Sequence, residues 1–125
     1  MARTILVVDD NADVRQMISE TFKRESDFEV CDEAENGKEA IDKALASHPD
    51  LLVLDLSMPV MNGLDAARGL KDRMPSVPII LFTFYVDLFV REAALAAGVS
   101  EVVSKSEHVS TLIAKARSHL YRNAA

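Results

Sequence analysis

The sequence has only one cysteine, no long apolar run and fewer positive than negative charges. The single cysteine, Cys31, cannot form an internal disulfide, and its apolar stretch favours a buried, unreactive thiol. No apolar run approaches the roughly 20 residues that cross a bilayer, and residues 1–4 lack the layout of a signal peptide. These absences predict a cytoplasmic protein with no membrane partner.

The charge balance argues against one class of partner. The 14 lysine and arginine residues stand against 20 aspartate and glutamate residues, which gives a formal net charge of −6. Such a field repels the phosphates of nucleic acid, so we expect no direct nucleic acid binding. The chain has 125 residues, 49% of them apolar, which is enough for one domain with one sizeable core.

Three apolar runs of four residues, at 5–8, 51–54 and 79–82, are each followed closely by polar or turn residues. Continuous apolar character is typical of strands covered on both faces, as in a parallel sheet between helical layers. Two further segments, 28–34 and 101–104, are charged or short, which suits strands at the sheet edges.

Apolar residues at helical spacing lie between the predicted strands. The predicted helices comprise residues 14–22, residues 40–45 after an Asn36-Gly37 turn, residues 64–73, a stripe of Val86, Phe89, Val90, Ala93, Ala94 and Ala97 that stops at Gly98, and residues 109–120. Strand and helix alternate five times, which predicts an α/β fold. Three apolar strands inside and two charged ones outside fit the order 2-1-3-4-5, the doubly wound five-stranded parallel sheet of flavodoxin-like (βα)5 folds.

Polar residues follow the ends of the predicted strands. Asp9 and Asp10 follow the first strand, Asp55 follows the third, Thr83 comes at the end of the fourth, and Lys105 comes at the end of the fifth. In such a sheet, ligands bind beyond the carboxyl ends of the strands, where the strand order reverses. One acid after a strand is ordinary in a turn or helix cap. Three acids at one edge indicate a site.

Three carboxylates at close range repel one another, so they take up protons or bind a cation. Mg²⁺ prefers oxygen ligands and keeps several waters, which suits one or two carboxylates and a backbone carbonyl from the loop after Asp55. A carboxylate is also a nucleophile that gives an aspartyl phosphate. Lys105 and Thr83 supply a positive charge and a hydroxyl donor for phosphoryl oxygens. Taken alone, Lys105 has the ordinary reading of a solvated surface residue.

Several motifs stand in a fixed order: Val-Val-Asp-Asp-Asn at 7–11, Asp55-Leu56-Ser57-Met58-Pro59 continuing to Asn62-Gly63-Leu64, then Thr83, Gly98 and Lys105-Ser106. In this order they resemble the receiver domain of bacterial two-component response regulators, over essentially the whole chain. The resemblance implies one receiver domain at 1–125, with no output domain in this chain.

The resemblance also implies roles for the residues of the motifs. Asp55 would be the phosphoacceptor, and Thr83 and Lys105 would bind the phosphoryl group. Mg²⁺ (or Mn²⁺) would be held by Asp10 directly, Asp9 through water, Asp55, and the backbone carbonyl of Ser57. A sensor histidine kinase would be the phosphodonor. The chain would then be a signalling domain rather than an enzyme, catalysing only its own phosphotransfer and slow dephosphorylation.

Among the positions that depart from the family pattern, two concern the conformational switch. Val102 stands where receivers usually carry a tyrosine or phenylalanine, and Phe84 follows the switch threonine where a small residue is usual. Phe84 or Tyr85 would then substitute for the absent aromatic. The departures also leave an alternative open, a degenerate receiver that acts as a phosphorylation-independent protein-interaction module.

Two other classes of protein share part of this pattern. A flavin-binding module has the same sheet order, but Asp9, Asp10 and Asn11 would repel its phosphate. A phosphatase with an aspartate nucleophile would depend on Asp9 instead of Asp55, and it needs a cap or a longer chain. Substitution of Asp55 therefore separates a receiver from such a phosphatase.

Leu88 and Leu95 form a second apolar line on the fourth predicted helix, away from its core-facing stripe. In the resembling family, the face of the fourth helix, fifth strand and fifth helix commonly mediates dimers or output contacts. This face is therefore a candidate surface for a homodimer or an output partner. Scattered exposed leucines are the ordinary alternative.

Overall fold

The computed structural model describes residues 2–121, in which strands and helices alternate along the chain. The elements are β1 (Arg3–Val8), α1 (Ala12–Lys23), β2 (Phe28–Ala34), α2 (Gly37–Ser47), β3 (Leu51–Leu54), α3 (Gly63–Arg73), β4 (Ile79–Thr83), α4 (Leu88–Ala96), β5 (Glu101–Ser104) and α5 (Val109–Tyr121). Among these residues no helix combines the length and apolar character that a membrane crossing requires.

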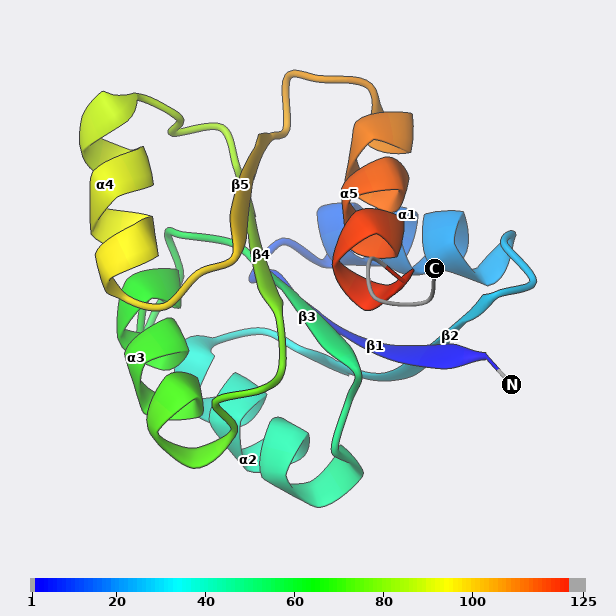
Figure 1. Ribbon diagram of the computed structural model, residues 1–125, viewed down its shortest axis with the longest axis horizontal. Helices are drawn as coiled ribbons and strands as arrows, with labels where there is room; N and C mark the ends of the chain where they lie inside the picture. The colour runs from blue at the N-terminus through cyan, green and yellow to red at the C-terminus, as the bar shows by residue number, and fades with distance from the viewer. Residues whose placement is uncertain (1, 122–125) are drawn as a thin grey trace.

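The five strands form one parallel sheet in the order β2-β1-β3-β4-β5, which confirms the predicted topology (Figure 1). Every residue of β3 and β4 is buried, and so are the last four of β1. The outer strands β2 and β5 are only partly buried along their length. The apolar strands therefore lie inside the sheet and the charged ones at its edges, as the sequence predicted.

Helices cover both faces of the sheet and create two apolar cores. The strands β1, β3 and β4 send alternate residues to opposite faces, because side chains on a strand alternate. Leu6, Val8, Leu52, Leu54 and Leu81 belong to the core under α2, α3 and α4. Ile5, Val7, Leu51, Val53 and Ile80 belong to the core under α1 and α5. Figure 1 shows these two helical layers on either side of the sheet.

All five helices of residues 2–121 begin at the carboxyl edge of the sheet, and four of them have the same kind of cap. Asn11, Asn36, Asn62 and Asp87 precede α1, α2, α3 and α4, and each side chain accepts the backbone N–H three residues later. Asparagine and aspartate favour this position because their oxygens satisfy a free amide of the first turn. These caps fix where each loop of the carboxyl edge ends.

The prediction for the fourth helix was wrong at Phe89. Its side chain is 79% exposed, although the sequence placed it on the core-facing stripe. α4 starts at Leu88 after the Asp87 cap, Ala94 is buried and Val90 packs against the same core, so Phe89 lies beyond the border of the core-facing stripe. Gly98, at φ +95°, follows the helix end as predicted, in a conformation that glycine adopts without strain.

The prediction of a buried Cys31 is only partly met. The residue is of intermediate exposure, and its thiol lies 3.5 Å from the carbonyl oxygen of Ile5 and 3.7 Å from the hydroxyl of Ser47. Burial raises the pKa of this thiol above its ordinary value. A raised pKa means less thiolate at neutral pH, which fits the expected lack of reactivity.

Candidate functional site

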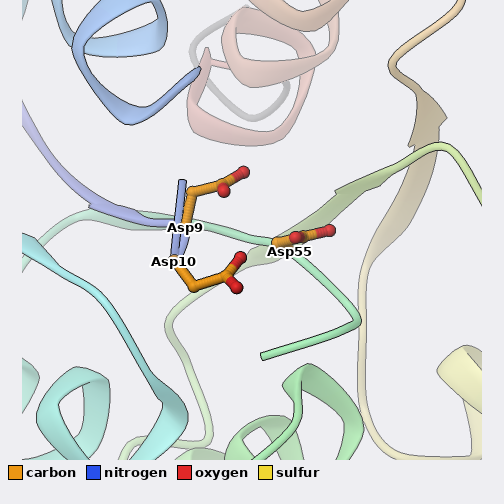
Figure 2. Close-up of side chains that lie close together, drawn as sticks. All are labelled: Asp9, Asp10 and Asp55. Carbon is orange, nitrogen blue, oxygen red and sulfur yellow. The ribbon is translucent and has the colours of Figure 1, made fainter. Parts of the chain in front are cut away.

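Three carboxylates from two strands meet at the carboxyl edge of the sheet. One oxygen each from Asp9, Asp10 and Asp55 lies within 4.8 Å of the others. Asp9 and Asp55 are 1% and 8% exposed, whereas Asp10 is exposed. Figure 2 shows the three side chains side by side, two from the end of β1 and one from the end of β3. The predicted convergence of these acids is therefore confirmed.

Backbone hydrogen bonds fix the two strand ends that carry these acids. The Asp55 N–H donates to the carbonyl of Val8 at 3.0 Å, and the Asp9 N–H donates to the carbonyl of Ala34 at 3.0 Å. Arg15 donates from Nη1 to the Asp9 carbonyl at 2.7 Å. The sequence does not indicate this contact, because nothing in the spacing of Arg15 points back to the strand end.

Lys105 is the cation of this cluster. Its ammonium Nζ lies 2.6 Å from Oδ2 of Asp9 and 3.5 Å from Oδ1 of Asp55, and its side chain is only 8% exposed. Its backbone N–H donates to the carbonyl of Thr83 at 2.9 Å, which places the end of β5 beside the end of β4. A solvated surface lysine, the ordinary reading of this residue, is therefore excluded.

The pKa of Asp55 is raised above its ordinary value, chiefly because burial disfavours the charged carboxylate. The positive charge of Lys105 opposes this rise, and the negative charge of Asp9 adds to it. The Leu56 N–H also donates to Oδ1 of Asp55 at 2.8 Å and favours the ionised form. A buried carboxylate under such opposing influences gains from any further positive charge.

The donor set fits a hard divalent cation. Three carboxylates carry a formal charge of −3, and Lys105 brings this to −2. Carboxylate oxygen is the ligand type that Mg²⁺ prefers, and an exposed Asp10 leaves room for the waters that this ion keeps. The residues present therefore suit Mg²⁺ in charge and in ligand type.

Thr83 and Ser57 stand at two other points of the same edge. Thr83 is fully buried at the end of β4, and its hydroxyl oxygen accepts the Tyr85 N–H at 3.2 Å, so the hydroxyl proton is free to be donated. Ser57 lies exposed in the loop between β3 and α3. Both residues thus lie at the carboxyl edge of the sheet, Thr83 at the end of β4 and Ser57 in the loop after β3.

Gly63 is a structural requirement that the sequence reading did not recognise as such. Its N–H donates to the Leu56 carbonyl at 2.8 Å, and a β-carbon on it would collide with the carbonyl oxygen of Asp55. The Asn62-Gly63 pair was interpreted only as part of a family motif and the start of a helix. In the structure Gly63 lets α3 begin directly against the backbone of Asp55.

Phe84 makes a contact that no spacing in the sequence indicated. The ammonium of Lys105 lies over its ring, 5.6 Å from the ring centroid. The ring is also 64% exposed, so it faces the site and the solvent together. Val102, at the position of the expected aromatic, is buried at 7% exposure within the core under α4.

Comparison with known proteins identifies the family of the chain. The family described as response regulator receiver domain matches residues 5–117, and the chain therefore belongs to this family. It is a receiver domain of two-component response regulators, a phosphorylation-dependent signalling domain.

Relatives and solved structures extend the comparison. A protein-glutamate methylesterase/protein-glutamine glutaminase of Methanosarcina mazei is 41% identical over 109 residues, which is 86% of this chain but 30% of that protein. A solved LuxR-family two-component response regulator from Aurantimonas sp. is similar with a TM-score of 0.93 and 27% identity, covering 98% of this chain and 87% of the other. The solved response regulator domain of Thermotoga maritima CheB is similar with a TM-score of 0.90 and 25% identity, covering 96% of this chain and 97% of the other.

Proposed function

We propose that Asp55 accepts a phosphoryl group from a sensor histidine kinase, with Mg²⁺ (or Mn²⁺) held by Asp9, Asp10, Asp55 and the carbonyl of Ser57. The observation that carries this proposal is the meeting of three carboxylates within 4.8 Å at one sheet edge, beside a buried lysine. The ion would neutralise the carboxylates and the phosphoryl oxygens together. Family membership supports a histidine kinase as the phosphodonor.

The proposed chemistry is a phosphoryl transfer between two side chains. An oxygen of Asp55 forms a bond to phosphorus as the bond between phosphorus and the kinase histidine nitrogen breaks, and the imidazole leaves. Lys105, 3.5 Å from Asp55, offsets the charge of the phosphoryl oxygens, and the Thr83 hydroxyl donates a hydrogen bond to one of them. Water later cleaves the acyl phosphate, which restores Asp55 and releases inorganic phosphate.

Intact mass measurement tests the assignment of Asp55. Wild type, Asp55→Asn and Asp42→Asn are incubated with Mg²⁺ and acetyl phosphate. Asp42 is an exposed aspartate of α2, paired with Lys38, and serves as the matched control. We expect wild type and Asp42→Asn to gain one phosphoryl mass and Asp55→Asn to gain none. A wild type that gains no mass would favour the degenerate receiver, and labelling of Asp55→Asn would assign the acceptor elsewhere.

The activity of the relatives does not transfer to this chain by similarity alone. The chain spans 30% of the Methanosarcina mazei protein and 22% of a Vibrio cholerae protein of the same name, which is 46% identical over 83 residues. We propose that residues 1–125 form one receiver domain, and that the chemistry of this domain is limited to phosphotransfer and slow dephosphorylation. A cytoplasmic location and the absence of nucleic acid binding stay predictions.

We also propose that the face of α4, β5 and α5 contacts a second copy or an output partner. Leu88 and Leu95 are 72% and 63% exposed and lie seven residues apart, on one side of α4. Exposed leucines so placed are typical of an interaction surface when they form part of a larger patch. Leu88→Asp and Leu95→Asp should weaken self-association or partner binding in sedimentation or titration experiments while the fold is kept. Unchanged binding would remove this surface from the proposal.

A further inference from the structure

The ammonium of Lys105 has three neighbours that compete for it. Two are the carboxylates of Asp9 and Asp55, at 2.6 Å and 3.5 Å, and the third is the ring of Phe84 at 5.6 Å. The face of an aromatic ring attracts a cation through its quadrupole, most strongly where water is scarce. The lysine side chain is only 8% exposed, whereas the ring is 64% exposed, so water is scarce on the lysine side of the contact alone. The ring is thus one of the groups that set where the ammonium lies.

A phosphoryl group on Asp55 changes this competition. It brings three acceptor oxygens and additional negative charge to within the reach of a flexible lysine side chain. Charge-assisted hydrogen bonds to such oxygens are stronger than attraction to a ring face. The ammonium is therefore drawn toward the phosphoryl oxygens and away from Phe84.

The residues that follow Phe84 in the chain include other exposed apolar side chains. Phe84 follows Thr83 directly, and the adjoining Tyr85, Leu88 and Phe89 are exposed at 63%, 72% and 79%. The Tyr85 N–H is tied to the Thr83 hydroxyl, which joins this segment to the end of β4. Because Phe84 is itself 64% exposed, a change in its contact with Lys105 takes place at the solvent-facing surface.

We propose that Phe84 is a positioning residue for Lys105: its ring holds the ammonium between Asp9 and Asp55 before phosphorylation and is released when a phosphoryl group takes the ammonium. This proposal rests on the proposed role of Asp55, and it names Phe84 as the residue whose contact changes when Asp55 is phosphorylated. It assigns this change to an exposed ring beside the site, because Val102 is buried and has no ring.

Nuclear magnetic resonance of the Lys105 ε-methylene in the full chain tests the contact. Protons over a ring face are shifted upfield by the ring current, so we expect an upfield resonance in wild type. Phe84→Leu keeps an apolar side chain but has no ring, and we expect it to lose the shift, whereas Phe84→Tyr keeps it. Phe89→Leu removes an exposed ring of α4 and is the matched control, with the Lys105 resonance unchanged. An identical resonance in wild type and Phe84→Leu would overturn the proposal.

Adding Mg²⁺ and acetyl phosphate to the same samples tests the release. We expect the wild-type Lys105 resonance to move toward the position seen in Phe84→Leu as phosphorylated protein accumulates by intact mass. A phosphoryl gain with an unmoved resonance overturns the proposed release and leaves Asp55 as the acceptor. No phosphoryl gain in wild type refutes the acceptor role itself, and the proposed release with it.

The rate of phosphorylation by acetyl phosphate separates positioning from simple shielding. If the ring positions Lys105, Phe84→Leu should react about three- to tenfold more slowly than wild type, and Phe84→Tyr should restore the rate. If the side chain only blocks the access of acetyl phosphate to Asp55, Phe84→Ala would react faster than wild type, and Phe84→Leu would react at the wild-type rate. The second pattern would overturn the proposal.

Discussion

The molecule contains two clusters of acidic side chains in which the pKa of an aspartate is shifted in opposite directions. One is the cluster of Asp9, Asp10 and Asp55, in which Lys105 pairs with Asp9 and Asp55. The other joins Glu25 and Asp27 to Arg117 of α5. Burial raises the pKa of Asp55, whereas a hydrogen bond from Arg117 lowers the pKa of Asp27.

The geometry of the Arg117 cluster explains the difference. The guanidinium donates from Nε and Nη2 to the two oxygens of Asp27, each at 3.0 Å, and from Nη2 to Glu25 at 2.6 Å. It also stacks 5.5 Å from the ring centroid of Phe28. A two-pronged pairing of this kind satisfies both carboxylate oxygens and joins α5 to the turn before β2.

The comparison teaches how to tell acids that stabilise the fold from acids held for chemistry. Each carboxylate at Arg117 has its partner within the chain, so it needs nothing from outside. The carboxylates at the sheet edge exceed their cation by two formal charges, so their arrangement costs stability until a cation binds. Three experiments test this difference between the two clusters.

The largest expected difference is in Mg²⁺ affinity. Asp10→Asn removes one charge and one ligand oxygen from the sheet-edge cluster, and we expect the dissociation constant for Mg²⁺ to rise about tenfold or more. Glu25→Gln makes the same chemical change at the Arg117 cluster and should leave the constant unaltered. Isothermal titration of both variants measures the difference. Equal effects of the two substitutions would mean that the ion responds only to net charge.

The second difference is the sign of the change in stability without divalent metal. Asp55→Asn relieves crowding of like charges and should raise the free energy of unfolding by about 1 kcal/mol, or a few degrees in Tm. Asp27→Asn breaks the pairing with Arg117 and should lower it by about 0.5 kcal/mol, a small value because that side chain is 34% exposed and screened by solvent. Thermal unfolding in a chelator checks both, and two changes of the same sign would contradict the contrast.

The smallest expected difference concerns pH. It is the difference between the pH at which Asp55→Asn becomes as stable as wild type and the pH at which Asp27→Asn does. The folded-state pKa of Asp55 is raised, so the charged carboxylate lowers the stability of the fold. This destabilisation is full above the folded-state pKa and disappears as the pH falls to the ordinary pKa of 3.8. The folded-state pKa of Asp27 is lowered, so its stabilisation persists down to 3.8 and is lost below it. As the pH is lowered in the presence of a chelator, the unfolding curve of Asp55→Asn should therefore meet that of wild type at a higher pH than the curve of Asp27→Asn does. The reverse order would show that burial does not dominate at Asp55.

Most of the fold was predictable because the determining pattern is local. The apolar runs at 5–8, 51–54 and 79–82 identify interior strands, and the alternation with helices then restricts the topology. The convergence of Asp9, Asp10 and Asp55 follows from that topology, since the ends of parallel strands meet at one edge. These predictions needed no knowledge of side-chain packing.

The features that were missed depend on contacts between distant segments. Arg117 and Asp27 are 90 residues apart, and nothing near either residue indicates the other. The contact between Lys105 and Phe84 likewise depends on how β4 and β5 end beside each other. Phe89 was misplaced because the spacing of apolar residues along a helix does not show how wide its buried stripe is, and in α4 Phe89 lies outside that stripe while Val90 and Ala94 pack against the core.

The shared starting edge of α1, α2, α3 and α4 has an electrical consequence. The peptide dipoles of a helix leave a partial positive charge, about half a unit, at its first turn. Four such ends open toward the side of the sheet where the carboxylates gather. The backbone itself therefore offsets part of the repulsion among the acids, and its field also favours an incoming dianion. Substitutions that leave these helix ends in place keep this contribution, whatever side chains they change.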